Sequence, residues 1–178
     1  MVFFIGAGPG DVDLITVKGR NTISKADVLI YAGSLVSAKH LDFCKSGAKI
    51  YNSASMTLEE VIGVMQKAED EGKITVRLHT GDPAIYGAIK EQMDELGSRN
   101  IGYEIIPGVS SFTAAAAAIK REFTLPNVSQ TVILTRVEGR TPVPPNEDLE
   151  KLASIGASMA IFLLASICAL MISSPRSC

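Results

Sequence analysis

Short apolar segments alternate with amphipathic and alanine-rich segments through the first 120 residues of this chain, and this alternation constrains the fold strongly. We predict strands at residues 2–5, 27–32, 74–80 and 103–107, and helices at 16–26, 57–71, 86–96 and 110–120. A repeated strand–helix–strand order is typical of a mainly parallel sheet that is flanked by helices. The sequence therefore predicts an α/β fold.

The sequence changes character after Lys120. The segments that follow predict a linker at 121–129, a strand at 129–135, a proline-rich loop at 138–148, an amphipathic helix at 146–154 and a buried strand at 159–164. We therefore expect two α/β domains, one at 1–120 and the start of a second at 121–178. The uncharged residues 155–172 are also a weak candidate for a membrane span, and a buried strand explains them more simply.

Composition narrows the functional classes. A net charge of −2 and a pI near 5.7 argue against nucleic-acid binding, which usually needs a basic stripe. The cysteines and histidines lack the spacing of zinc ligands, so we expect no metal site. No signal peptide is visible, and we expect a cytoplasmic protein that does not span a membrane.

Three loops rich in glycine, proline and serine each follow a predicted strand directly. They are residues 6–11 (GAGPGD), 80–87 (TGDPAIYG) and 107–111 (PGVSS). The carboxyl ends of parallel strands lie at one edge of a sheet, and ligands of such folds bind there. We therefore expect the three loops to line one crevice.

The first loop is similar to a dinucleotide-binding loop but departs from that pattern. Asp11 replaces the third glycine of G-x-G-x-x-G, and the second strand ends in Tyr31-Ala32-Gly33, without an acid for a ribose hydroxyl. An aspartate beside the loop repels phosphate and suits a positively charged ligand. S-adenosylmethionine is such a ligand, because it carries a sulfonium and an ammonium group and no phosphate. A plain strand-to-helix turn is the alternative.

The other two loops also have two interpretations each. Gly81 permits close approach of a ligand and Pro83 holds Asp82 extended, but a structural Gly-Asp-Pro turn has the same residues. Ser110 and Ser111 either cap the alanine-rich helix or offer backbone amides to a ligand. Tyr86 is equally consistent with core packing and with stacking on a ligand.

Two arginines, Arg136 and Arg140, flank a loop of the expected second domain. Together they suit a ligand with several carboxylates, because guanidinium pairs with carboxylate through two parallel hydrogen bonds. Singly, each is explained as a solvated surface charge.

These segments resemble the tetrapyrrole methyltransferases of cobalamin and sirohaem synthesis. The resemblance rests on GAGPGDVDLITVKG, TGDPAIYG and IPGVSSFTAAAAA in this order. Within that family, REFTLPNVSQTVILTRVEGRTPVP resembles the precorrin-4 or cobalt-precorrin-4 C(11)-methyltransferases. The resemblance implies the tetrapyrrole methylase fold, with S-adenosylmethionine bound between two domains. It also implies methyl transfer to carbon 11 of a tetrapyrrole and, for the intact family, a homodimer.

Site residues follow from the resemblance by position in the motifs. It implies donor contacts from Thr80, Gly81, Asp82, Ile85, Tyr86, Ser110, Ser111 and Leu163, with Pro9 near the donor. It also implies that Arg136 and Arg140 bind substrate carboxylates. Asp11 is our candidate for a catalytic base.

The sequence departs from the family after residue 164, where it reads ASICALMISSPRSC and stops. Family members continue further, and the ending shows no helical or strand periodicity. We interpret it as a truncation or a shift of reading frame that leaves the second domain incomplete. There are three alternatives to an active C(11)-methyltransferase. The chain is an inactive remnant, another tetrapyrrole C-methyltransferase, or an oxidoreductase, and Asp11 disfavours the last.

Overall fold

The computed structural model describes the chain except for residues 34, 140, 165–166 and 172–178, and it describes no side chain from residue 163 onward. Contacts between Cα atoms divide the chain into two compact units, Met1–Ser110 and Ser111–Cys178. We expected this boundary later, after Lys120. The alanine-rich helix groups with the second unit because the ring of Phe112 packs on other rings there, with centroids 5.5 Å from Phe123 and 6.4 Å from Phe162.

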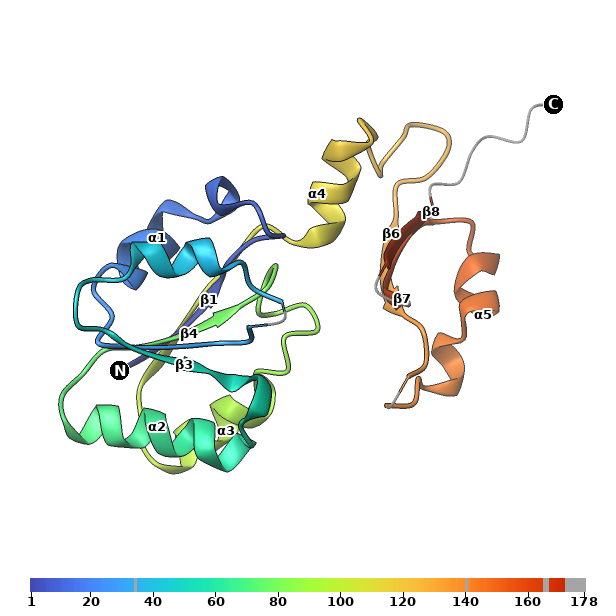
Figure 1. The fold of residues 1–178 in the computed structure, drawn as a ribbon. Coiled ribbons are helices and arrows are strands. Elements are labelled where there is room, and N and C mark those ends of the chain that lie inside the picture. Colours follow the sequence, from blue (N-terminus) through green and yellow to red (C-terminus); the bar gives the residue numbers. More distant parts are fainter. Residues whose placement is uncertain (34, 140, 165–166, 172–178) are drawn as a thin grey trace. The chain divides into compact units, whose positions relative to one another are not determined.

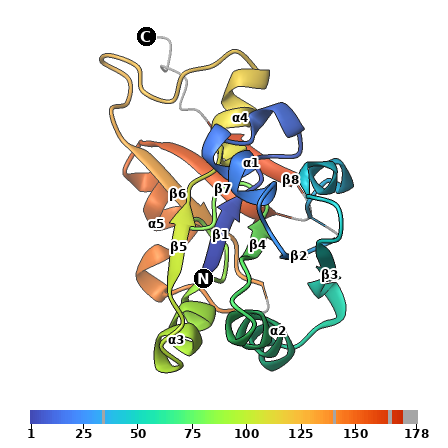
Figure 2. The ribbon, with the colours of Figure 1, turned by 90° about the vertical axis from the view of Figure 1, so that its left-hand side faces the viewer.

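A parallel sheet forms the centre of the first unit, as the alternating sequence predicts (Figures 1 and 2). Its 5 strands lie in the order β3-β2-β4-β1-β5. The strands are β1 (Val2–Gly6), β2 (Val28–Tyr31), β3 (Lys49–Asn52), β4 (Thr75–His79) and β5 (Tyr103–Ile106). Because every neighbouring pair is parallel, all five strands end at one edge of the sheet.

Helices cover both faces of this sheet (Figure 1). They are α1 (Val17–Ile23) on one face and α2 (Leu58–Asp70) and α3 (Lys90–Ser98) on the other. Alternate residues of the strands point to opposite faces, so Phe4 packs in the cluster under α2 and α3, whereas Ile5 packs in the cluster under α1. Burial on both faces explains the nearly continuous apolar runs of β1 and β2.

The helix predicted at 57–71 forms as α2, and its capping box is confirmed. The Thr57 hydroxyl accepts from the backbone N–H of Glu60, and the Glu60 carboxylate accepts from the backbone N–H of Thr57. The helix predicted at 86–96 begins later, at Lys90. The earlier start is wrong because Tyr86 and Ala88 have positive φ, 55° and 50°, which a right-handed helix does not allow.

Several short elements escaped prediction. These are the edge strand β3 and the 3₁₀ helices η1 (Val12–Leu14), η2 (Ala38–Phe43) and η3 (Ser53–Ser55). The β3 segment is short and mostly exposed, so its sequence shows little of the apolar and polar alternation that marks a half-buried strand. Its pairing with β2 depends on tertiary contact rather than on local pattern.

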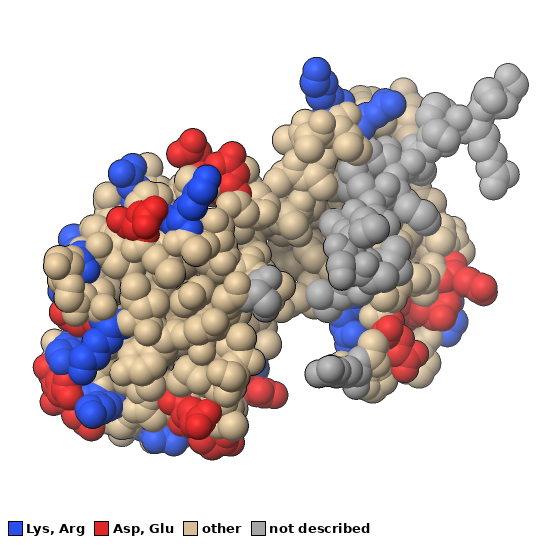
Figure 3. Space-filling model, viewed as in Figure 1, with Lys and Arg blue, Asp and Glu red and all other residues tan. Residues whose placement is uncertain are grey.

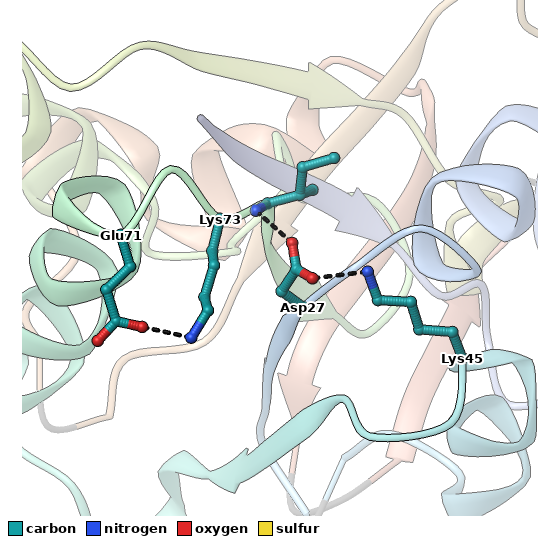
Figure 4. Close-up of polar contacts among 5 residues, drawn as sticks. Asp27, Lys45, Glu71 and Lys73 are labelled. Atoms are coloured by element: carbon teal, nitrogen blue, oxygen red, sulfur yellow. Dashed lines mark hydrogen bonds and ion pairs between the residues drawn. The ribbon is translucent and has the colours of Figure 1, made fainter.

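Charged residues connect the amino-terminal ends of β2 and β4 (Figure 4). The Asp27 carboxylate accepts from Lys45 Nζ at 2.6 Å and from the backbone N–H of Ile74 at 2.9 Å. Those two bonds, Lys45 first, hold the pKa of Asp27 below its usual range. Glu71 and Lys73 form a further ion pair beside them. These contacts lie at the edge of the sheet opposite the glycine-rich loops, so they fasten the strands at their amino-terminal ends.

The second unit has a smaller mixed sheet. Its elements are α4 (Ser111–Ala118), β6 (Val132–Arg136), η4 (Pro145–Glu147), α5 (Leu149–Ser154), β7 (Ser158–Leu164) and β8 (Ile167–Met171). The predicted strand at 159–164 is confirmed as β7, which pairs parallel with β6 and antiparallel with β8. The ending shows no strand periodicity in its sequence, and β8 forms there through backbone pairing with β7. In the part of the chain that is described, no helix has the length and apolar character of a membrane span.

Candidate ligand site at the carboxyl ends of the strands

The glycine-rich loops of the first unit meet, as predicted. Gly8 and Gly81 form an antiparallel bridge, in which the Gly81 N–H donates to Gly8 O at 2.8 Å and the Gly8 N–H donates to Gly81 O at 3.3 Å. The Ala7 N–H donates to His79 O at 2.7 Å. The loops after β1 and β4 are therefore joined through their backbones.

Asp82 joins the third loop to the second. Its carboxylate accepts from the Ala84 N–H at 2.8 Å, which closes a turn over Pro83. The other oxygen accepts from the Gly108 N–H at 3.1 Å, across the loop after β5. Asp82 thus has a structural role in the Gly-Asp-Pro turn, which was one of the two interpretations of this sequence. Its contact with a ligand stays a prediction.

Close backbone approach explains the glycines at this junction. A Cβ on Gly6 would lie 2.5 Å from Gly81 O and 2.6 Å from Gly108 Cα. Gly6 and Gly81 are buried, so these backbones leave no space for a larger residue between them. Only glycine allows the three loops to approach one another this closely.

The turn after Asp82 presents its side chains in a strained backbone. Tyr86 and Ala88 take the left-handed conformation, and 45% of the Tyr86 surface is exposed. Gly87 lies so close to the Pro83 carbonyl that an added Cβ would clash with it. Strain of this type in a loop at the strand ends is typical of ligand sites. Core packing of Tyr86, one of the two interpretations, does not fit this exposure.

The charged residues of these loops are all acidic, namely Asp11 and Asp82. Asp11 is exposed, and its carboxylate accepts from the Asp13 N–H at 3.0 Å, where it caps η1. Its catalytic role stays a prediction. Pro9 and Ile85 are half-buried, and Thr80 is exposed at the end of β4. Without lysine or arginine, the loops suit a cationic ligand better than a phosphate.

The remaining predicted contacts belong to the junction and to the second unit. Ser110 is buried directly before α4, and Ser111 is the first residue of that helix. Leu163 lies in β7, but its side chain is outside the described residues, as is the whole of Arg140. The Arg136 guanidinium donates to the carbonyls of Thr141 and Pro142, at 3.0 Å each, and so holds the loop after β6. Whether Arg136 also binds substrate stays a prediction.

Sequence reasoning missed a polar row on β4. Thr75, Arg77 and His79 alternate with Val76 and Leu78 and face the α2 and α3 side of the sheet. Burial lowers the pKa of Arg77 to about 10, and burial together with the nearby Arg77 lowers the pKa of His79 to about 3. The signal was the polar half of the alternation in ITVRLHT, which predicted only a strand.

A parallel sheet whose carboxyl edge gathers three loops rich in glycine, proline and serine, with Asp11 and Asp82 as their charged residues, is typical of α/β proteins that bind a small ligand there. The sequence profile of the Tetrapyrrole (Corrin/Porphyrin) Methylases matches residues 1–177. The chain belongs to that family, as its motifs indicated.

Individual relatives agree with this assignment. The cobalt-precorrin-4 C(11)-methyltransferase of Methanocaldococcus jannaschii is 62% identical over 93% of this chain and 64% of its own length. The precorrin-4 C(11)-methyltransferase of Mycobacterium tuberculosis is 48% identical over 93% of this chain and 66% of its own length. The chain therefore spans a little under two thirds of these relatives.

Solved structures show the same fold. The X-ray structure of a cobalt-precorrin-4 methyltransferase, a cobalamin biosynthetic enzyme, superposes with a TM-score of 0.89 and 54% identity, covering 91% of this chain and 68% of that one. The uroporphyrin-III C-methyltransferase of Thermus thermophilus, complexed with S-adenosylhomocysteine, has a TM-score of 0.72 and 25% identity, covering 91% and 65%. The predicted α/β tetrapyrrole methylase fold is confirmed.

Proposed function

We propose that this chain takes part in S-adenosylmethionine-dependent methyl transfer to carbon 11 of precorrin-4 or cobalt-precorrin-4. The observation that carries the proposal is the 62% identity to the cobalt-precorrin-4 C(11)-methyltransferase of M. jannaschii over 93% of this chain. The site agrees with it, because the loops gathered at the strand ends carry acidic residues and suit a sulfonium ligand. Both forms of the substrate, with and without cobalt, fit the relatives named above.

The loops of the first unit supply the donor site in this proposal. Thr80, Gly81 and Asp82 lie where β4 ends, and Ile85 and Tyr86 follow them in the strained turn. Ser110, Ser111, Pro9 and Leu163 complete the proposed contacts. The exposed Thr80 hydroxyl is the group best placed to bind a polar ligand, because Asp82 is already engaged by two backbone N–H groups and the Gly81 N–H and C=O are bonded to Gly8.

Orientation is the main task of the protein in this reaction. A bond forms between the ring carbon and the methyl carbon while the bond from the methyl carbon to sulfur breaks, and its electron pair stays on sulfur. The bound donor supplies an activated leaving group, so no nucleophilic side chain is required. Alignment of two reactants contributes about 7–11 kcal/mol in favourable cases. Asp11 is the proposed base, and Arg136 and Arg140 are the proposed partners of substrate carboxylates.

Assembly and surroundings are also part of the proposal. We propose a homodimer in the cytoplasm, without nucleic-acid or membrane partners. On the face drawn in Figure 3, Lys and Arg side chains lie among Asp and Glu side chains, which is consistent with a small-molecule enzyme.

Calorimetric titration of the 178-residue chain with S-adenosylhomocysteine tests the donor site. We expect saturable binding, which Thr80→Val weakens by roughly fivefold through the loss of one hydrogen bond. Thr131→Val is the matched control, because Thr131 is an exposed threonine of the second unit and should not change the affinity.

The other outcomes separate the alternatives. A chain that is folded by circular dichroism but binds no S-adenosylhomocysteine is an inactive relative of these enzymes, and the proposal fails. Saturable binding of NADH in the same experiment would favour the oxidoreductase instead. If the donor binds, turnover of precorrin-4 against uroporphyrinogen III separates the C(11) enzyme from another C-methyltransferase of the family.

A further inference from the structure

The central strand β4 carries an unusual row of polar side chains. It is the third strand of the 5-stranded sheet, and central parallel strands are normally apolar on both faces. Thr75 and His79 are buried, and neither Thr75 Oγ1 nor His79 Nε2 has a hydrogen-bond partner among the described residues. Burial of polar groups without partners costs free energy, so such a row indicates a function beyond packing.

Arg77, in the middle of this row, lines a cavity of about 140 Å³. The cavity lies between β4, the segment that follows β3 and the amino-terminal end of α2, where Thr57 and Leu58 line it. Arg77 Nε donates to Gln92 Oε1 at 3.2 Å, and Arg77 Nη1 donates to Ser53 Oγ at 2.9 Å. The guanidinium is therefore held in a fixed orientation beside an open space.

Both of these partners are neutral. Among the described residues, the ion pairs involve other cations, and no carboxylate lies within 4.0 Å of the Arg77 guanidinium. A guanidinium has five N–H donors, and only two of those of Arg77 are used in these bonds. A largely buried cation without an anion is costly, and an incoming anion relieves that cost.

We propose that this cavity binds a carboxylate group, with Arg77 as its main donor. The planar guanidinium fork matches a carboxylate through two parallel hydrogen bonds. The positive end of the α2 dipole, at Thr57 and Leu58, adds to the attraction. Ser53 positions Arg77 and does not bind the carboxylate itself, because its hydroxyl already donates to Tyr31 O at 3.2 Å.

The ligand class follows if the proposed function holds. In that case the carboxylate belongs to a side chain of the tetrapyrrole, and Arg77 is a substrate contact in the first unit, apart from Arg136 and Arg140. That last step rests on the proposed function. The carboxylate site itself does not, and its experiment needs neither donor nor tetrapyrrole.

Titration of the ¹⁵N-labelled chain with sodium acetate tests the site directly. We expect a saturable shift of the Arg77 Nε–Hε resonance with acetate and none with acetamide, the neutral molecule of the same shape. Arg99, an exposed arginine that pairs with Glu95 on α3, is the internal reference in the same spectrum and should not saturate. An Arg77 resonance that does not move, or that moves equally with acetamide, overturns the inference.

Gln92→Glu provides a matched variant. It places a carboxylate 3.2 Å from Arg77 Nε, so we expect the internal ion pair to reduce acetate affinity at least tenfold while titration with S-adenosylhomocysteine is unchanged. Ser53→Ala should weaken acetate roughly fivefold through a less ordered guanidinium, and Ser53→Thr should restore it. Unaltered acetate affinity in Gln92→Glu contradicts the site. If acetate does not bind at Arg77 but S-adenosylhomocysteine still binds, the carboxylate site is refuted and the proposed function is not.

Discussion

At Gly6, three stretches of backbone pass within contact distance of one another. The Cβ of an alanine there would lie 2.5 Å from Gly81 O and 2.6 Å from Gly108 Cα, and these backbone atoms cannot rotate away. We expect Gly6→Ala to lower the free energy of unfolding by about 1–3 kcal/mol, as overpacking usually does. Urea unfolding followed by tyrosine fluorescence measures it, since the chain has 4 tyrosines and no tryptophan and Tyr31, Tyr51, Tyr86 and Tyr103 all lie in the first unit.

Gly63→Ala is the matched control for that substitution. Gly63 lies exposed in α2, and nothing lies within 4 Å of an added Cβ. Alanine is the better helix former, so we expect this variant to gain about 0.5–1 kcal/mol. If both variants lose stability equally, the backbone junction at Gly6 has more room than its geometry indicates.

Asp82 provides a second test at the scale of one residue. Asp82→Ala leaves the N–H groups of Ala84 and Gly108 without their acceptor, and we expect a loss of about 1–3 kcal/mol in the free energy of unfolding. Asp42→Ala, at an exposed carboxylate of η2, should stay within about 0.5 kcal/mol of the original chain. Equal stabilities of the two variants in urea would refute the role of Asp82 in joining the loops. A loss also means that reduced donor binding in Asp82→Ala cannot alone identify a ligand contact.

Among the elements, the central strand β4 carries a buried histidine, His79, whose protonation makes the stability of the fold depend on pH. The folded chain keeps His79 neutral down to about pH 3, because burial and then Arg77 lower its pKa from 6.5. Between these two pH values the unfolded chain binds the extra proton, so stability falls as the pH falls through this window. We expect a slope approaching about 1.4 kcal/mol per pH unit below pH 6. Urea unfolding at pH 6.0, 5.5 and 5.0 measures it.

The control for this slope is His79→Leu. The Nε2 atom of His79 has no hydrogen-bond partner among the described residues, so an apolar side chain should be tolerated at neutral pH. We expect the variant to keep its stability between pH 6.0 and 5.0. A slope that is the same with and without His79 would assign the pH dependence to another group.

The amino-terminal end of α2 was predicted from its capping box, and the contribution of the cap to stability can be tested at Thr57. Thr57 caps the helix through its hydroxyl, and Thr57→Ala removes that bond, so we expect a loss of about 1 kcal/mol in the free energy of unfolding. Thr57→Ser keeps the capping oxygen and should retain most of the stability. A serine variant as unstable as the alanine variant would place the effect in the lost methyl group rather than in the cap.

Elements were predictable from the sequence where burial leaves a strong pattern or a cap marks an end. The central strands and α2 meet these conditions, and the meeting of the loops after β1, β4 and β5 follows from parallel topology alone. The start of α3 could not be predicted, because the turn around Pro83 and Gly87 imposes the left-handed backbone of Tyr86 and the sequence does not show this. Arg77 was missed for a similar reason, since its burial and its cavity exist only after distant segments have packed.

For the whole molecule, the question is how far the first unit is self-sufficient. Both of its apolar clusters, one on each face of the sheet, consist entirely of residues up to Ile106. All five strands of the sheet also lie within this range, and β3 and β5 are its two edge strands. A domain of about this size buries enough apolar surface to fold alone.

We therefore expect the fragment Met1–Ser110 to unfold cooperatively in urea, with a midpoint close to that of the full chain. Tyrosine fluorescence compares the two directly, because every tyrosine is present in both. The same fragment carries Arg77 and its cavity, so the acetate-dependent shift of the Arg77 resonance should persist in it. A fragment without a cooperative transition would mean that the first sheet depends on the second unit. The donor and carboxylate sites would then have to be studied in the full chain alone.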